Sequence, residues 1–284
     1  MQENSKSYLP LISVVIACYN DYEDIEVAVT SVLKQTYNNI EIIVVDDGSD
    51  IKTKEVLKKL EPQITKLITQ ENQGQSIARN NGIKQAKGIY ILNLDSDDFF
   101  EPTFCEKAIN QFEIDKETRI VTCLANRFSK KGGSDIFTPR GGTIDNFLFS
   151  NSAIGSSMFK REDWKKCGGY EEKLPILGFE DWELYINILK KGGYTHVLHE
   201  VLFNYQVREN STTDRIKNQK LDKFKHIIFK HKELYKNNFE GLIENLVNRI
   251  NKESHEKVKN TNRIEFLIGK SLLKPLRGIK SLLK

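Results

Sequence analysis

The sequence predicts an α/β fold with a mostly parallel central sheet flanked by helices. Over the first hundred residues, short β-branched apolar runs alternate with segments of helical periodicity, which is the rhythm of βαβ units. Three of these runs end in polar or acidic clusters, at the strand ends where parallel sheets bind ligands. We expect one domain over residues 1–213, followed by a helical, basic C-terminal extension over residues 214–284.

Four strands are expected in the first half, of which the first, second and fourth are apolar enough to be buried on both faces of the sheet. They cover residues 11–17, 40–45, 64–69 and 88–94. Apolar residues at helical spacing predict the intervening helices over residues 24–33, 52–60 and 76–86. Further along, the pattern predicts strands over residues 120–124, 154–160 and 194–205, a helix over 180–191 and a loop or hairpin over 130–142.

Composition is typical of a globular protein, with 39% hydrophobic and 29% charged residues. No apolar run approaches the roughly 20 residues that a spanning helix needs. The N-terminus also lacks an apolar signal segment. A cytoplasmic location is therefore expected. The four cysteines are widely scattered, so we expect reduced thiols rather than a disulfide framework or a zinc site.

Charge divides unevenly along the chain. Residues 214–284 carry 18 Lys and Arg against 8 Asp and Glu, whereas residues 1–213 are net acidic. Within the basic part, residues 264–284 mix apolar and basic side chains in the manner of an interfacial membrane segment. We expect either peripheral contact with the inner face of the membrane or a terminal helix packed on protein. Because no known nucleic-acid-binding module is recognisable, nucleic acid is not an expected partner.

The acidic cluster at residues 95–98 (DSDD) directly follows an expected buried strand. Carboxylates at a strand end suit Mg²⁺ or Mn²⁺, which share their ligand shell with substrate phosphates. A solvated turn or a helix cap is the alternative. An EF-hand calcium-binding loop starting at Asp95 is excluded, because Phe99 and Phe100 stand where a ligand and a glycine are required.

Seven segments of the sequence form an ordered series, namely residues 13–20 (SVVIACYN), 31–37 (SVLKQTY), 42–49 (IIVVDDGS), 72–80 (NQGQSIARN), 88–98 (GIYILNLDSDD), 168–170 (GGY) and 178–184 (GFEDWEL). In this series the sequence resembles the GT-A glycosyltransferases, specifically the large inverting family 2 of bacterial cell-surface glycan synthesis. The resemblance covers roughly residues 10–213.

The resemblance implies a UDP-sugar donor, held at the three strand ends and the loop before the third helix. The donor residues that it implies are Ala17, Tyr19, Asn20, Asp46, Asp47, Gly74, Arg79, Asp95 and Ser96. Tyr19 would lie against the nucleobase and Asp47 would accept a hydrogen bond from the uracil N–H. Turn capping remains an alternative for the aspartates, and pairing with a surface carboxylate remains one for Arg79.

Two further roles follow from the same resemblance. Asp97 would be the main ligand of Mn²⁺ or Mg²⁺, with Asp95 as the second ligand. Asp181, supported by Glu180, would be the base that takes the proton from the acceptor hydroxyl. A helix N-terminus is a further explanation for these two acids, and it is compatible with catalysis.

The sequence departs from the family at one position near the metal. Many relatives carry a histidine there, where this chain has Arg208. An arginine cannot ligate a cation, but it can contact phosphate. The Q-x-x-R-W motif of processive synthases is absent, which favours single addition to a saccharide or lipid-linked saccharide. The alternatives are a non-catalytic scaffold of the same fold and a nucleotide-sugar-forming nucleotidyltransferase. The sequence does not predict an oligomeric state.

Overall fold

The computed structural model describes residues 9–173, 175–208, 211, 215–261, 263 and 266. By its contacts the chain divides into two compact units, Met1–Lys230 and His231–Lys284. The helix at residues 220–230 therefore belongs to the first unit, beyond the division expected from composition between residues 213 and 214. That compositional division stays a prediction.

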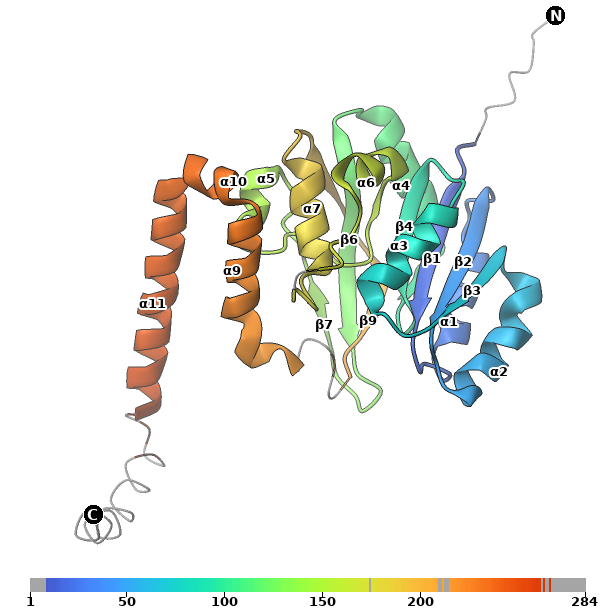
Figure 1. The fold of residues 1–284 in the computed structure, drawn as a ribbon, viewed down its shortest axis with the longest axis horizontal. Helices are drawn as coiled ribbons and strands as arrows, with labels where there is room; N and C mark the ends of the chain where they lie inside the picture. The colour runs from blue at the N-terminus through green and yellow to red at the C-terminus, as the bar shows by residue number, and fades with distance from the viewer. Residues whose placement is uncertain are drawn as a thin grey trace, which may run out of the picture. The chain divides into compact units, whose positions relative to one another are not determined.

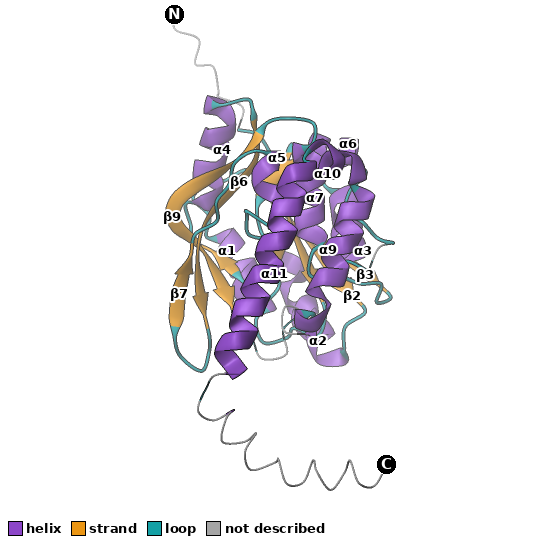
Figure 2. Cartoon of the chain, turned by 90° about the vertical axis from the view of Figure 1, so that its left-hand side faces the viewer, coloured by secondary structure: helices purple, strands orange, loops and turns teal. Residues whose placement is uncertain are grey.

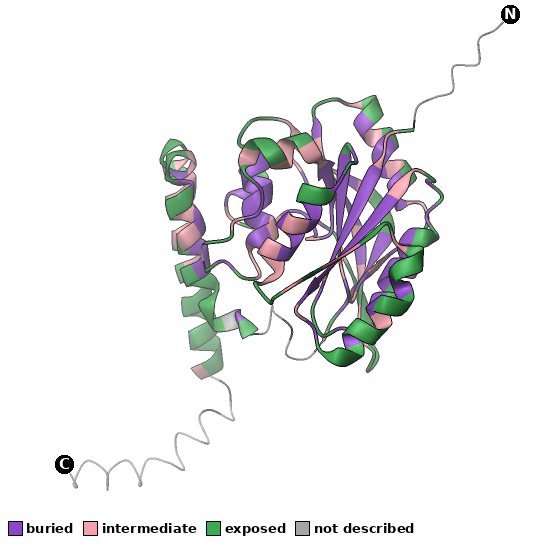
Figure 3. Cartoon of the chain, turned by 45° about the vertical axis from the view of Figure 1, so that its right-hand side comes forward, coloured by how far each residue is buried: buried purple, intermediate pink, exposed green. Residues whose placement is uncertain are grey.

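The first unit is built on a sheet of nine strands among the described residues (Figure 1). Its first four strands are parallel and stand in the order β3-β2-β1-β4. They are β1 (Ile12–Cys18), β2 (Ile40–Asp47), β3 (Lys66–Gln70) and β4 (Tyr90–Asp95). β1, β2 and β4 are buried along nearly their whole length (Figure 3). This burial explains their almost continuous apolar character.

The sheet continues with strands of mixed direction, in the order β8-β6-β9-β5. These strands and the hairpin partner β7 are β5 (Phe99–Phe100), β6 (Thr118–Phe128), β7 (Ser134–Phe137), β8 (Met158–Lys160) and β9 (Tyr194–Gln206). β8 is antiparallel to both β4 and β6, whereas β6 and β9 run parallel side by side (Figure 2). β6 and β7 form the hairpin expected around residues 130–142.

Helices cover both faces of this sheet, as expected for an α/β fold. They are α1 (Ile25–Leu33), α2 (Ile51–Leu60), α3 (Gln75–Gln85), α4 (Phe104–Ile114), α5 (Ile144–Phe147), α6 (Arg161–Cys167), α7 (Glu180–Leu189) and α9 (Lys220–Lys230), with single 3₁₀ turns at Glu61–Gln63 and Lys217–Gln219. α1 and α4 share one apolar core with alternate strand residues such as Val14 and Leu92. α3 lies on the opposite face against β1 and β2, where Gly82 meets Val15.

The second unit consists of α10 (Lys232–Asn237) and α11 (Phe239–Thr261). α11 has the apolar periodicity of an amphipathic helix, yet none of its residues is buried. No helix in the described part of the chain has both the length and the apolar character that crossing a membrane requires. Apart from Phe266, the basic segment expected to contact membrane at residues 264–284 lies outside the described residues.

Candidate active site

The carboxyl ends of β1, β2 and β4 meet at one edge of the sheet. The register pairs Cys18 with Asp46 and Ala17 with Asp95. On the outer side, Asp47 is paired with Gln70 of β3. The three strand ends that carry the predicted donor residues are therefore direct neighbours, because parallel strands place their carboxyl ends at the same edge.

Asp47 organises the loop that leads into α3. Its Oδ1 accepts hydrogen bonds from Gln70 Nε2 at 2.8 Å and from the Gln73 N–H at 2.9 Å, and its Oδ2 accepts from the Gly74 N–H at 2.9 Å. Asp47 is only 3% exposed. Gly74 has φ = 91°, a conformation that favours glycine, and α3 begins at the next residue. The carboxylate thus shapes the segment where the nucleotide is expected.

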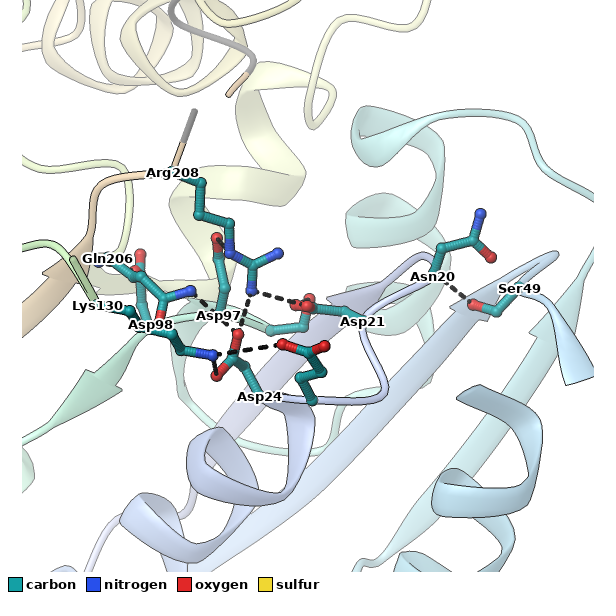
Figure 4. Close-up of polar contacts among 11 residues, drawn as sticks. Asn20, Asp21, Asp24, Ser49, Asp97, Asp98, Lys130, Gln206 and Arg208 are labelled. Carbon is teal, nitrogen blue, oxygen red and sulfur yellow. Dashed lines mark hydrogen bonds and ion pairs between the residues drawn. The ribbon is translucent and has the colours of Figure 1, made fainter. Parts of the chain in front are cut away.

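The turns after β1 and β2 are tied to each other. The Asn20 N–H donates to Ser49 Oγ at 3.1 Å (Figure 4), and Asn20 Oδ1 accepts from the Asp50 N–H at 2.7 Å. Asp46 accepts from the Ser49 N–H at 2.9 Å, which is the turn-capping contact considered as its alternative. Asn20 has a positive φ of 54°. Tyr19 stays 54% exposed beside this tied pair of turns, so its ring is available to a flat ligand.

Arg79 of α3 links two acidic centres that lie far apart in the sequence. Its Nη2 donates to Asp95 Oδ1, and its Nη1 lies 3.7 Å from Glu180 Oε1. The guanidinium also lies over the ring of Tyr170, with its carbon 5.4 Å from the centroid. Because Arg79 is only 3% exposed, the expected alternative of a surface ion pair does not describe it.

These neighbours keep the guanidinium of Arg79 positively charged. Burial by itself would lower its pKa, but Asp95, Tyr170 and Glu180 outweigh burial and raise the pKa above its ordinary value. Neither Nε nor Nη1 donates a hydrogen bond within the part of the chain that the structure describes. Arg79 therefore carries a permanent positive charge in a buried position beside the end of β4.

The acidic cluster after β4 is balanced by Arg208, as Figure 4 shows. Arg208 Nε lies 3.1 Å from Asp97 Oδ2, and its Nη2 donates at 2.7 Å to both Asp21 and Asp24. Ser96 Oγ donates to Asp21 Oδ2 at 2.7 Å. The predicted neighbourhood of Arg208 and Asp97 is thus observed, and the guanidinium takes one oxygen of the predicted metal ligand.

Asp98 plays a different part from Asp97. Its Oδ1 accepts from the Gln206 N–H at 2.8 Å, and the residue is 1% exposed. Gln206 in turn donates through Nε2 to Asp24 Oδ2 at 3.0 Å. Asp98 therefore fastens the end of β9, and with it Arg208, to the end of β4.

The charges of the acidic cluster are compatible with a bound cation. Burial, followed by the charge of Asp95, raises the pKa of Asp97 to about 7, while Arg208 opposes the rise. Asp95 and Asp97 are both half-buried and offer the hard oxygen atoms that Mg²⁺ and Mn²⁺ prefer. Among the described residues no group of three His, Cys, Asp or Glu is arranged to hold a metal. Asp95 Oδ1 accepts from Arg79 and Gln75, and Asp97 Oδ2 faces Arg208, so the metal role of the two carboxylates stays a prediction.

Asp181 lies at the start of α7, next to Glu180. Its Oδ2 accepts a hydrogen bond from Asn151 Nδ2 at 3.0 Å. Gly155 adjoins the same oxygen so closely that a Cβ there would stand 2.9 Å away. Burial, then the charge of Glu180, raises the pKa of Asp181 to about 7, although Arg79 opposes the shift. A carboxyl with such a pKa can accept a proton near neutral pH.

Several site residues were not predicted from the sequence. Gln75 donates to Asp95 Oδ1 at 2.9 Å, Asn151 reaches Asp181, and Asp21 and Asp24 pair with Arg208. Asp21 follows the Tyr19-Asn20 motif directly, so proximity in sequence was an available signal for it. Asn151 carried no such signal, because its segment lacks a readable pattern.

A cavity of about 440 Å³ adjoins the acidic cluster. It is bordered by the turn after β1, the β6–β7 hairpin and the end of β9. Lys130 on the hairpin contacts Asp24 Oδ1 at 2.7 Å across this space. The cavity therefore opens beside Arg208, which is one of its lining residues.

Comparisons with known proteins show the family and the fold of the chain. Residues 13–164 match the sequence model of glycosyl transferase family 2, and residues 147–227 match one described as the N-terminal domain of galactosyltransferase. An uncharacterised glycosyltransferase of Rickettsia typhi is 31% identical over 77% of this chain and 70% of its own length. The Escherichia coli enzyme WfaP, named a UDP-Glc:alpha-D-GlcNAc-diphosphoundecaprenol beta-1,3-glucosyltransferase, is 30% identical over 78% of this chain and 84% of its own.

Longer relatives match only in part, since the chain spans between 23% and 32% of two chondroitin synthases and a hyaluronan synthase. Among solved structures, Staphylococcus aureus TarS 1–349 in complex with UDP-GlcNAc superposes with a TM-score of 0.60. The match covers 72% of this chain and 60% of that one at 19% identity, which establishes the fold. With the family sequence model covering more than half of its length, the chain belongs to glycosyl transferase family 2 and has the GT-A fold.

Proposed function

We propose that this protein transfers a hexosyl or N-acetylhexosaminyl group from a UDP-sugar to a saccharide or lipid-linked saccharide, with inversion, during synthesis of a surface polysaccharide. The observation that carries the proposal is Arg79, which joins Asp95 at the end of β4 to Glu180 beside Asp181. The names of WfaP and of the TarS complex support the donor class, and that of WfaP supports a lipid-linked acceptor.

The nucleotide would lie across the ends of β1 and β2. An ionised carboxylate has about four acceptor sites, and Asp47 uses three of them on Gln70, Gln73 and Gly74. One site on Oδ2 remains for the ring N–H of uracil. The exposed ring of Tyr19 offers the stacking face. Main-chain groups at Ala17 and Asn20 border the same place.

The diphosphate would lie between Asp97 and the two arginines. Asp97, with Asp95 as second ligand, would hold Mn²⁺ or Mg²⁺ together with diphosphate oxygens. When bound, the ion neutralises charge that develops on the leaving diphosphate. Arg79 contributes a fixed positive charge beside Asp95. Arg208 can turn from Asp97 toward a phosphate oxygen, since its side chain is 35% exposed.

Asp181 would act as the base. The acceptor hydroxyl gives its proton to Asp181 Oδ2 while its oxygen forms a bond to the anomeric carbon. The bond from that carbon to the diphosphate breaks on the opposite side, and the nucleoside diphosphate leaves. A single in-line displacement of this kind inverts the anomeric centre, so an α-linked donor gives a β-linked product. Gly155 has no Cβ to crowd the carboxylate, since a Cβ there would stand 2.9 Å from Asp181 Oδ2.

Calorimetry with UDP, GDP and ADP, each with and without Mn²⁺, tests the donor assignment. We expect UDP to bind most tightly and Mn²⁺ to strengthen that binding. Equal binding of the three nucleotides would contradict the uracil contact at Asp47. Binding that Mn²⁺ leaves unchanged would contradict the metal role of Asp97.

Turnover of Asp181→Asn tests the base. We expect a loss of at least about 100-fold in kcat, because the amide cannot accept the proton. UDP affinity should stay near the wild-type value. Glu162→Gln is the matched control, since Glu162 is an exposed acid in the first turn of α6. Normal turnover by Asp181→Asn would refute the assignment.

A further inference from the structure

α9 follows residues 10–213, on which the resemblance was recognised from the sequence, and it packs on the helix that carries the proposed base. Its buried residues are Lys223, Phe224 and Ile227, which lie on one side of the helix. The sequence assigned this helix to a basic extension. Its lysines look solvated from composition alone, and only the fold shows that one side of α9 is buried.

The first contact between the two helices is aromatic. The ring of Phe224 stacks on Trp182 of α7, with centroids 5.6 Å apart and planes within 8° of parallel. Both residues are at least 95% buried. Trp182 follows Asp181 directly, and its indole N–H donates to the carbonyl of Phe147 at 2.6 Å. The stack therefore fixes the residue next to the base.

The second contact is ionic. Lys230 Nζ lies 2.7 Å from Glu183 Oε1 and donates to Glu171 Oε2 at 2.6 Å. Glu183 is completely buried, and a buried carboxylate needs a charged or hydrogen-bonding partner. It also accepts from Asn187 Nδ2 at 2.6 Å. Lys230 thus holds the first turn of α7 through Glu183, which lies two residues after Asp181.

The start of α7 is not held by a side-chain N-cap among the described residues. Phe179 at its N-cap makes no side-chain hydrogen bond. On the inner side, the Tyr185 hydroxyl contacts the carbonyls of Ile154 and Gly155 at 3.0 and 2.7 Å. Gly155 is the residue against which Asp181 rests. α7 is therefore held between the segment at Gly155 on one side and α9 on the other.

We propose that Phe224 and Lys230 of α9 are positioning residues. They hold the start of α7 so that the carboxylate of Asp181 is correctly placed to accept the proton of the acceptor hydroxyl. The inference rests on the proposed role of Asp181. It makes α9 part of the catalytic apparatus rather than of a tail. Because small displacements of a reacting group cost large factors in rate, the loss should fall on kcat.

Steady-state kinetics of full-length Phe224→Ala and Phe224→Leu test the stack. Both should lower kcat, Phe224→Ala by roughly 10- to 100-fold, and both should move the midpoint of the pH–rate profile. The Kd for UDP should change less than about twofold, because none of the residues expected to contact UDP lies on α7 or α9. Phe229→Ala is the matched control, since Phe229 lies on α9 but is 64% exposed. It should behave as wild type.

Lys230 is tested by its own series. Lys230→Met removes the ammonium group beside the buried carboxylate of Glu183 and should lower kcat, whereas Lys230→Arg should restore most of it. The double variant Glu183→Gln, Lys230→Met removes both charges and separates positioning from the cost of burying a carboxylate without this ammonium. It should fold and bind UDP, but with reduced kcat.

The outcomes distinguish this inference from the proposed function. If Asp181→Asn is inactive while Phe224→Leu and the double variant keep wild-type kcat and pH profile, α9 has no positioning role. If Asp181→Asn is fully active, the proposed base itself is wrong. If the Phe224 and Lys230 variants lose UDP affinity in parallel with kcat, their effect is a general structural one and the positioning role is refuted.

Discussion

At the scale of single residues, the acidic end of β4 is kept in balance by one arginine. Arg208 contacts Asp21, Asp24 and Asp97 at once. Three carboxylates converging on one guanidinium repel one another once that charge is removed. Arg208 therefore stabilises the free site, and at the same time it competes for the oxygen atoms that a metal would use.

Replacing Arg208 should separate these two effects. Arg208→Met should tighten Mn²⁺ binding to the donor-free protein by about tenfold, equivalent to about 1.4 kcal/mol, because Asp97 loses a competing cation. It should weaken UDP-sugar binding, because a phosphate contact is lost. Titration of Mn²⁺ followed by electron paramagnetic resonance measures the first effect, and calorimetry measures the second. Lys130→Met is the control, since Lys130 pairs with Asp24 and not with Asp97; weaker Mn²⁺ binding by Arg208→Met would contradict this account.

Asp181 should govern the pH dependence of turnover. A base works only when it is deprotonated, and burial beside Glu180 raises the pKa of Asp181 to about 7. We therefore expect kcat/KM to rise about tenfold per pH unit below 7 and to level off above it. The initial rate at saturating metal, measured between pH 5 and 9, reports this. A profile that stays flat between pH 5 and 7 would exclude Asp181 as the titrating base.

At the scale of elements, α3 places Arg79 because the helix approaches the sheet closely. Gly82 in the middle of α3 lies against β1 and β2, and a Cβ there would stand 2.5 Å from a methyl of Val15 and 3.0 Å from one of Val45. Only a residue without a side chain allows this approach. The close packing fixes the height of Arg79 above the strand ends.

Gly82→Ala should therefore destabilise the protein. Alanine favours a helix by about 1 kcal/mol over glycine, but overpacking in a filled core typically costs about 1–3 kcal/mol, and the 2.5 Å contact makes the clash prevail. We expect a lower midpoint in urea denaturation and a parallel loss of turnover as Arg79 shifts. Lys84→Ala on the exposed side of α3 is the control and should change stability by less than about 0.5 kcal/mol. A stabilised Gly82→Ala would show that α3 can move away from the sheet.

Most helices and strands were predicted from the pattern of apolar residues in the sequence, and the exceptions have physical causes. The strand expected over residues 154–160 shortens to β8 at Met158–Lys160. The Ile154 carbonyl instead accepts from Tyr185 and from Ser157 Oγ, so it is not available to a strand ladder. α4 was not predicted, although Phe104, Ala108 and Phe112 stand at helical spacing and all are buried.

At the scale of the whole molecule, the chain combines an α/β unit that carries the candidate site with a second, helical unit. The basic residues are concentrated after residue 213. A lysine or arginine near an anionic leaflet contributes about 1 kcal/mol to membrane binding. We propose that residues 264–284 bring the enzyme to the inner face of the membrane, where a lipid-linked acceptor would be met.

Charge reversal in the full-length chain tests this. Replacing Lys270, Lys274, Arg277 and Lys280 with glutamate should abolish flotation with vesicles that contain anionic lipid. The wild-type chain should float with those vesicles and lose binding in high salt. Neutral vesicles are the control. Flotation that is unchanged in the reversed variant would refute the membrane role of residues 264–284.

The sequence by itself determined the family, the parallel strands and the three strand ends that meet at one edge. These features depend on apolar periodicity and on local motifs, which are patterns among residues close together in the chain. The tertiary structure decided what joins those motifs. Arg79 bridges Asp95 and Glu180, Arg208 closes on the acids after β1 and β4, and α9 holds α7. These contacts join residues that are far apart in the chain. Only the packing of helices on the sheet brings such side chains within a few ångströms, so no local pattern could reveal them.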